Sequence, residues 1–132
     1  MKILLDTDIC IYLIKNNPES VRKHFTSLRP GDVGISSITA AELRYGIAKS
    51  QAKAKNAAAL EAFLLPLEIV PFDEAAAVQY GEIRAALEKK GTPIGPLDTL
   101  IAAQAVSIGV TLATNNAREF KRVPGLKCVN WT

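Results

Sequence analysis

Four residues with side-chain oxygens stand beside apolar runs that lie far apart in this 132-residue sequence: Asp6, Glu42, Asp98 and Asn116. A carboxylate next to a core-forming run is costly to bury unless a positive charge meets it. No Lys or Arg follows Asp6 or Asp98 within a few residues, so no local side chain compensates these acids. A divalent cation shared by the four residues would do so. Because the candidate ligands are all oxygens, Mg²⁺ or Mn²⁺ fits them better than Zn²⁺.

Most of these residues also have a purely structural interpretation. Thr39 and Glu42 have the spacing of a capping box, in which the Glu side chain accepts from the Thr amide at a helix start. Asn116 and Glu119 have the same spacing. Asp98 falls in the first turn of an expected helix, where the helix dipole favours an anion. Taken singly, Glu42, Asp98 and Asn116 therefore leave both interpretations open, whereas Asp6 has the weakest structural alternative because it directly follows an apolar strand.

The sequence lacks the motifs of several other enzyme classes. His24 is the only histidine, which excludes a His-based zinc site, and a Ser-His-Asp triad unless His24 lies within it. Since Arg22 and Lys23 precede it, we interpret His24 as a surface or partner-contact residue. No GxxxxGK[ST] loop is present, and no GxGxxG follows an expected strand. These absences argue against P-loop and dinucleotide-binding folds.

Length and composition indicate one globular domain over residues 1–132. No apolar run approaches the roughly 20 residues of a membrane span. The N-terminal segment lacks the basic region and cleavage site of a signal peptide. We therefore expect a cytoplasmic protein that does not enter the membrane. Cys10 and Cys128 form no metal or redox motif, so both are expected to be reduced thiols.

The charge balance is mildly basic, with 16 Lys plus Arg against 13 Asp plus Glu and a net charge of +3. If several acids gather in one site, the remaining surface is more basic than this total suggests. Short basic groups recur along the chain, at Arg22–His24, at Lys49, Lys53 and Lys55, at Lys89 and Lys90, and at Arg118, Lys121 and Arg122. Solvated helix faces account most simply for any one group, while together they suit a polyanionic partner.

Alternating apolar runs and helical periodicity predict an α/β fold, with a central, mainly parallel sheet of four to five strands flanked by helices. Strands are expected at residues 2–6, 33–36, 68–70, 110–113 and 127–129. Helices are expected at residues 9–15, 18–25, 39–50, 52–65, 74–90 and 96–108. Asp8, Asn17 and Asp73 are predicted N-caps. In such sheets, sites form at the carboxyl ends of strands, which is where Asp6 and Asn116 stand.

Four segments in order carry a family resemblance: MKILLDTD at residues 1–8, ISSITAAELRYG at 35–46, IGPLDTLIA at 94–102 and LATNNAREF at 112–120. Together they resemble PIN-domain ribonucleases, and more narrowly the VapC toxins of type II toxin–antitoxin systems. The resemblance covers nearly the whole chain. It implies a PIN-like fold and a divalent-metal-dependent endoribonuclease that inhibits translation by cleaving RNA, with tRNA and initiator tRNA as the first expectation.

The resemblance also assigns the site residues. It implies that Asp6, Glu42 and Asp98 are metal-binding acids. Many relatives have an aspartate where this chain has Asn116, so Glu119 is expected to supply the missing charge as a metal ligand. Asn116 is kept as a fourth catalytic residue. Asp8 stands where an Asn is common in the family, and its role is open between tighter metal binding and helix capping.

Partners follow from the same resemblance. We expect a VapB-like antitoxin, contact with operator DNA only through that antitoxin, a homodimer, and no membrane. Family members bind the antitoxin in an apolar groove formed by the early helices. Ile11, Ile14, Phe25, Phe63 and Leu64 are candidates to line it, although core packing is the more general role for such residues.

Three alternatives remain at this point. Asp6-Thr7-Asp8 resembles the DxD motif of haloacid-dehalogenase-type phosphatases, but the chain ends before the later motifs of that class. A receiver-type domain needs a phosphoacceptor after the third strand, where Asp73 is better explained as a helix cap. A degenerate PIN domain that binds RNA without cleaving it is the third alternative, because Asn116 is neutral.

Overall fold

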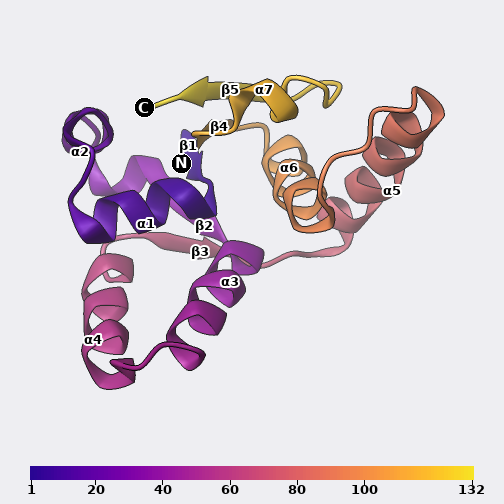
Figure 1. The fold of residues 1–132 in the computed structure, drawn as a ribbon. Coiled ribbons are helices and arrows are strands. Elements are labelled where there is room, and N and C mark those ends of the chain that lie inside the picture. Colours follow the sequence, from indigo (N-terminus) through magenta and orange to yellow (C-terminus); the bar gives the residue numbers. More distant parts are fainter.

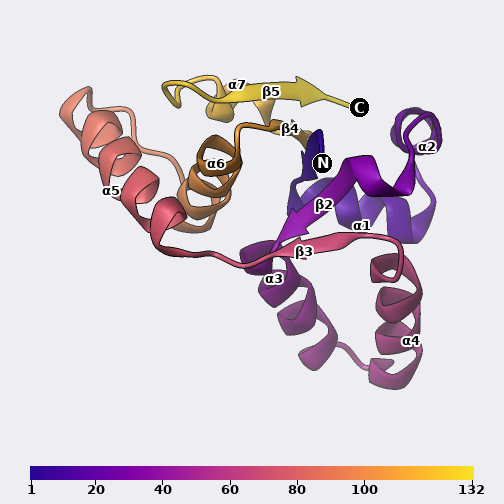
Figure 2. The ribbon, with the colours of Figure 1, turned by 180° about the vertical axis from the view of Figure 1, so that it is seen from behind.

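A computed structural model describes all residues, 1–132, and contains one five-stranded sheet in the order β3-β2-β1-β4-β5. Every neighbouring pair is parallel. The strands are β1 (Ile3–Leu5), β2 (Val33–Ser36), β3 (Glu68–Val70), β4 (Thr111–Thr114) and β5 (Lys127–Asn130). Figure 2 shows the edge strands β3 and β5 pointing in different directions, as the twist of a sheet requires. The predicted α/β class and parallel sheet are confirmed.

Seven α-helices surround the sheet. They are α1 (Thr7–Lys15), α2 (Glu19–Thr26), α3 (Ser37–Ala48), α4 (Lys53–Leu64), α5 (Glu74–Lys89), α6 (Pro96–Ile108) and α7 (Ala117–Phe120), with a short 3-10 turn η1 (Pro30–Asp32) before β2. Figure 1 shows α3 and α4 as a pair extending from one side of the sheet, and α5 and α6 as a second pair. The predicted strands and long helices are found within about two residues of these bounds.

Two apolar cores lie on opposite faces of the sheet, because successive strand side chains point to opposite faces. Leu4 and Leu112 belong to the core formed with α5, α6 and α7. Leu5 and Ala113 belong to the core formed with α1, α2, α3 and α4. All four are fully buried. The central pair β1 and β4 is thus covered on both faces, and its carboxyl ends are held in a fixed position.

Two predicted helix starts are wrong by one or two residues. Asp8 was expected to cap the first helix, yet Asp6 is the N-cap, its side chain accepts from the Thr7 amide, and Asp8 lies inside the first turn. Asn17 was expected to cap the second helix with Pro18 inside it, but Pro18 is the N-cap and no side-chain cap bond forms. The cap prediction at Asp73 is confirmed by a bond from the Ala76 amide.

The capping box that Thr39 and Glu42 could have formed is not present. Helix α3 begins two residues earlier, and its N-cap is Ser36, whose side chain accepts from the Ile38 amide at 3.0 Å. Thr39 is therefore a buried residue inside the helix, and Glu42 lies six residues after the N-cap, too far along the helix for a capping box. Glu42 therefore has no role in capping α3, and its carboxylate is available for another contact.

None of the seven α-helices combines the length and the apolar character that a membrane span requires.

Candidate metal centre

The carboxyl ends of β1 and β4 bring Asp6 and Thr114 together. The two strands pair in register with Leu5 opposite Ala113, so the next residue of each strand lies at the same edge. The Thr114 hydroxyl donates to Asp6 Oδ2 at 2.7 Å, and the Thr7 amide donates to Asp6 Oδ1 at 2.8 Å. Asp6 is only 5% exposed. Hydrogen bonds to both of its oxygens therefore hold the Asp6 carboxylate in one orientation.

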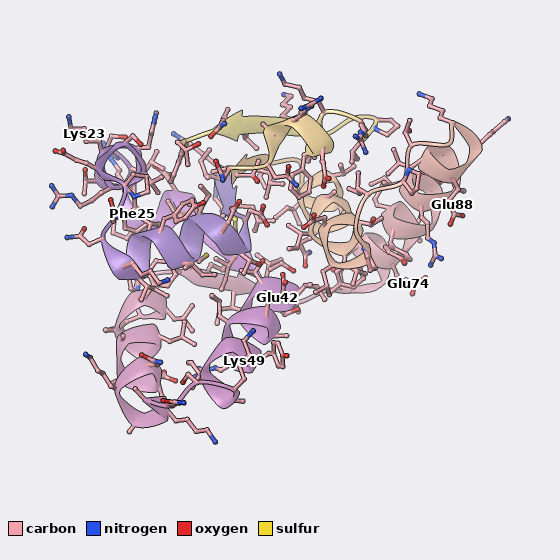
Figure 3. All side chains as sticks on the ribbon, viewed as in Figure 1. Lys23, Phe25, Glu42, Lys49, Glu74 and Glu88 are labelled. Atoms are coloured by element: carbon pink, nitrogen blue, oxygen red, sulfur yellow. The ribbon has the colours of Figure 1, made fainter.

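Glu42 reaches the same region from α3. Its Oε1 accepts from the Thr7 hydroxyl at 2.7 Å, across 35 residues of sequence. Figure 3 shows Glu42 near the end of α3 that meets the sheet, with Lys49 at the far end. Thr7 is a site residue that was not expected from the sequence; it contacts Asp6 through its backbone and Glu42 through its side chain. Its position directly after Asp6, at the first helical residue, is the signal that could have found it.

Asn116 and Glu119 are joined side chain to side chain. Asn116 Nδ2 donates to Glu119 Oε2 at 2.8 Å, and the Asn116 amide donates to the Thr114 hydroxyl at 2.8 Å. Asn116 is the N-cap of the short helix α7, but neither side chain bonds to a free helix amide. The alternative in which Glu119 is a cap partner is therefore excluded. The pair instead forms a connected group with Asp6 through Thr114.

Asp98 lies in the first turn of α6, as predicted. Burial, followed by the negative charges of Asp6, Glu119 and Glu42 in that order, raises the pKa of its carboxyl to about 6. These charges act on Asp98 only because their carboxylates lie near it. The structure thus brings the predicted acids from β1, α3, α6 and α7 into one electrostatic group.

Asp8 adds a further acid beside Asp6. Burial, followed by the negative charge of Asp6, raises the pKa of Asp8 to about 7. Burial also raises the pKa of Asp6, against the opposing hydrogen bond from Thr114. Asp8 Oδ2 accepts from the Asn115 amide at 3.3 Å, while Asp8 Oδ1 is buried without a partner. The acids lack a positive partner, since each of the three ion pairs of the chain is exposed and made by other residues.

The donor set fits a hard divalent cation, although the ligands are not drawn tightly together. No group of three Asp, Glu, His or Cys side chains is close enough to hold a metal in this arrangement. Glu42 is held by its contact with Thr7, and Glu119 is held by its contact with Asn116. The oxygen-only donors and the unpartnered oxygen of Asp8 suit Mg²⁺ or Mn²⁺.

The proximity of these acids predicts that the free energies of unfolding of the wild type and Asp98→Asn, both in EDTA, differ by an amount that depends on pH. The folded-state pKa of Asp98 is about 6, above its ordinary value of 3.8. Between these values the folded protein binds more protons than the unfolded chain, so Asp98 lowers the free energy of unfolding as pH rises. The variant should therefore become increasingly more stable than the wild type from about pH 4 to pH 7. Urea unfolding at several pH values measures this difference, and a constant difference would contradict it.

An apolar groove lies beside the acidic group. It has a volume of about 270 Å³ and is lined from α1, α3 and α4 by Ile11, Ile14, Lys15, Glu42, Leu43, Gly46, Ile47, Asn56, Ala59 and Leu60. Two of the five predicted groove residues, Ile11 and Ile14, line it. Phe25 and Phe63 instead pack against each other, with ring centroids 6.4 Å apart, and Leu64 is buried in the core.

His24 and the cysteines lie away from the acids. The exposed His24 ring stacks on Trp131, with centroids 5.4 Å apart and planes inclined by 8°. Its interpretation as a surface residue agrees with this position, and it takes no part in the site. Cys10 and Cys128 are both free thiols, as predicted. Burial raises the pKa of the Cys10 thiol well above its ordinary value, so this cysteine is an unreactive core residue.

Comparison with known proteins agrees with this architecture. Residues 3–126 match the PIN domain, so a parallel sheet with acids at its carboxyl edge is a PIN fold here. The tRNA(fMet)-specific endonuclease VapC of Salmonella typhimurium is 47% identical over 131 residues, covering 99% of this chain and 98% of the relative. Ribonuclease VapC2 of Rickettsia felis is 45% identical over 132 residues, with 99% and 98% covered.

A solved structure is similar to this chain over its whole length. The crystal structure of VapBC2 from Rickettsia felis bound to a DNA fragment from their promoter contains a chain that superposes with a TM-score of 0.94 at 44% identity, covering 100% of both chains. The chain therefore belongs to the VapC ribonucleases of the PIN domain family. The sequence-based family assignment is confirmed. The family assignment excludes the phosphatase and receiver alternatives, and Asp73, the phosphoacceptor that a receiver domain would need, caps α5.

Proposed function

We propose that this chain is the toxin of a toxin–antitoxin pair and cleaves tRNA, with initiator tRNA as its substrate, using a divalent cation held by Asp6, Glu42, Asp98 and Glu119. The observation that carries the proposal is the hydrogen-bonded arrangement at the strand ends, in which Thr7 joins Asp6 to Glu42 and Thr114 joins Asp6 to the pair formed by Asn116 and Glu119. The name of the Salmonella relative, a tRNA(fMet)-specific endonuclease, supports the choice of substrate.

The side chains around the acids have distinct tasks in this proposal. Thr114 and the Thr7 amide fix the Asp6 carboxylate, and the Thr7 hydroxyl fixes Glu42. Asn116 uses its amide nitrogen to hold Glu119, which leaves its side-chain oxygen for the substrate or a water molecule. Bound Mg²⁺ or Mn²⁺ would lower the pKa of the attacking water and offset charge on the phosphate.

Basic residues next to the acids suit the RNA backbone. Arg118, Lys121 and Arg122 follow Asn116 in the sequence, and all three are exposed. Contacts from such residues to phosphates position the RNA without reading its sequence. Selection of one tRNA would then come from its folded shape and from unpaired loop bases. Because tRNA is the proposed substrate, we place the protein in the cytoplasm.

The apolar groove suits an antitoxin segment. Its lining from α1, α3 and α4 is mostly apolar, and Glu42 stands in its wall. A VapB-like segment in this groove would reach an acid of the site and block substrate access. The Rickettsia complex was solved with promoter DNA, so we propose that operator DNA is contacted through the antitoxin. We also propose a homodimer, which light scattering would detect as twice the chain mass of 14.2 kDa.

The test is incubation of purified protein with total tRNA, in Mg²⁺ and in EDTA, followed by sequencing of the fragment ends. Cleavage of initiator tRNA is expected in Mg²⁺, loss of cleavage in EDTA, and recovery after excess Mn²⁺ is added. Prior mixing with the purified antitoxin should suppress cleavage. Cleavage that survives chelation would contradict the metal role, and cleavage of other RNAs alone would contradict the substrate.

A degenerate PIN domain remains the second candidate, because Asn116 is neutral where many relatives have an aspartate. It predicts tRNA binding that is detectable by filter retention, together with no fragments in Mg²⁺ or Mn²⁺. Four acids converging from four elements favour the cleaving enzyme over this alternative.

A further inference from the structure

Asp8 is an acid that the four proposed ligands do not account for. It lies in the first turn of α1, two residues after Asp6, and its side chain is half-buried. Asp8 Oδ2 accepts from the Asn115 amide at 3.3 Å. Asp8 Oδ1 is the one buried side-chain nitrogen or oxygen in the protein without a hydrogen-bond partner. Buried polar atoms are otherwise satisfied here, as in most folded proteins, so this atom needs a partner of another kind.

The structural task of Asp8 does not require a charge. Asn115 is a junction in the loop before Asn116: its side chain donates to the Tyr12 hydroxyl at 3.1 Å and accepts from the Thr132 hydroxyl at 2.7 Å. Asp8 fixes the backbone of this junction with one oxygen. An asparagine at residue 8 could accept the same hydrogen bond through its amide oxygen without bringing a second carboxylate beside Asp6. Loop anchoring therefore accounts for neither the charge nor the second oxygen.

We propose that Asp8 is a further cation-binding acid of the site, in which its free oxygen faces the same divalent ion as Asp6. This inference rests on the proposed metal-dependent function. A cation would supply the missing partner of Asp8 Oδ1 and offset the repulsion between the two neighbouring acids. The Asn115 contact would hold Asp8 in place, and would link the loop that carries Asn116 to the ion.

Loop anchoring and proton sharing would each give Asp8 a different behaviour from that of a metal ligand. If Asp8 only anchors the loop, an amide at this position would preserve every contact and leave metal affinity unchanged. If Asp6 and Asp8 share a proton in the working enzyme, the pair carries one negative charge, and replacing Asp8 with Asn keeps that charge, so metal affinity would again change little. Only a charged Asp8 that faces the ion links its removal to weaker binding and, at the same time, to a more stable metal-free protein.

The experiment measures Mn²⁺ binding by isothermal titration calorimetry at neutral pH, and the melting temperature in EDTA and in Mn²⁺, for the wild type, Asp8→Asn and Asp32→Asn. Asp32 is the matched control, because it is an acid in η1 without a side-chain hydrogen bond or ion pair. We expect Asp8→Asn to weaken Mn²⁺ binding by roughly 10–100-fold, the range seen when groups that support a metal site are removed. We also expect it to melt higher than the wild type in EDTA and to gain less from Mn²⁺. Asp32→Asn should match the wild type in Mn²⁺ affinity.

Each result decides the inference. Unchanged Mn²⁺ affinity in Asp8→Asn would overturn it, while leaving the proposed nuclease function intact. A lower melting temperature in EDTA, or failure of Asp8→Asn to fold, would also overturn it, because the charge would then be stabilising in the metal-free protein. A wild type that binds no Mn²⁺ would overturn the proposed function itself, together with this inference.

Discussion

Asp6→Asn is expected to lower tRNA cleavage by at least about 100-fold, and to abolish the growth arrest that expression of the wild type without its antitoxin should cause. Loss of one charged ligand removes a few kcal/mol of transition-state stabilisation, and about 1.4 kcal/mol corresponds to a factor of ten. The fold should survive, because Asn can still accept from the Thr7 amide through its side-chain oxygen, and its amide can donate to the Thr114 hydroxyl. Fragment analysis and colony counts measure the two effects.

The control for this prediction removes an acid of the same type away from the site. Asp73 is exposed and caps α5 through a bond from the Ala76 amide. Asn is as good a cap as Asp, so Asp73→Asn changes the net charge by the same amount and should cleave and arrest growth like the wild type. Because burial of Asp6 disfavours its charge, Asp6→Asn should also melt higher than the wild type in EDTA. Undiminished toxicity of Asp6→Asn would show that Asp6 is not central to the chemistry.

The sequence predicted those features that depend on neighbouring residues. Asp73 caps its helix with a bond to Ala76, only three residues away. Pro96 begins α6, and Gly109 ends it in the left-handed conformation at φ 71°. Such signals act within one helical turn and can be recognised without the fold. Alternation of strands and helices predicted the parallel sheet for a similar reason, since each β-α-β unit favours one arrangement.

The sequence could not predict which of several competing caps the fold would select. Ser36 caps α3 from the last residue of β2, where its hydroxyl also donates to Gln104 Oε1 at 3.0 Å, 68 residues away. That partner is buried, so Ser36 was favoured over Thr39 by a contact invisible in the local sequence. Asp6 rather than Asp8 is the N-cap of α1 for a similar reason, because the pairing of β1 with β4 places Asp6 against Thr114.

The site residues also combine features that the sequence shows with features that depend on the fold. Asp6, Glu42 and Asp98 were identified by resemblance, yet their proximity became visible only through the fold, which brings α3 and α6 to the edge formed by β1 and β4. The contact between Thr7 and Glu42 spans 35 residues and had no sequence signal of its own. Side chains that orient a site can be recognised only after the elements that carry them are assembled.

Glu42→Gln is expected to lose cleavage without losing stability. Gln can still accept from the Thr7 hydroxyl, so the contact that orients the side chain is preserved. The charge is lost, and charge is what a metal-binding carboxylate contributes. Cleavage in Mg²⁺ should therefore fall by at least about 100-fold, while the melting temperature in EDTA stays within a few degrees of the wild type.

Ser36→Ala is the opposite case and serves as the comparison. It removes the cap bond from the Ile38 amide and leaves the buried Gln104 Oε1 without its donor. Loss of a cap together with an unsatisfied buried acceptor costs about 2 kcal/mol. Urea unfolding should show this loss, while most of the cleavage activity is retained, because no acid of the site bonds to Ser36. If Glu42→Gln cleaved tRNA at nearly the wild-type rate, Glu42 would be only an acceptor for Thr7, and the cation would be held by the remaining acids.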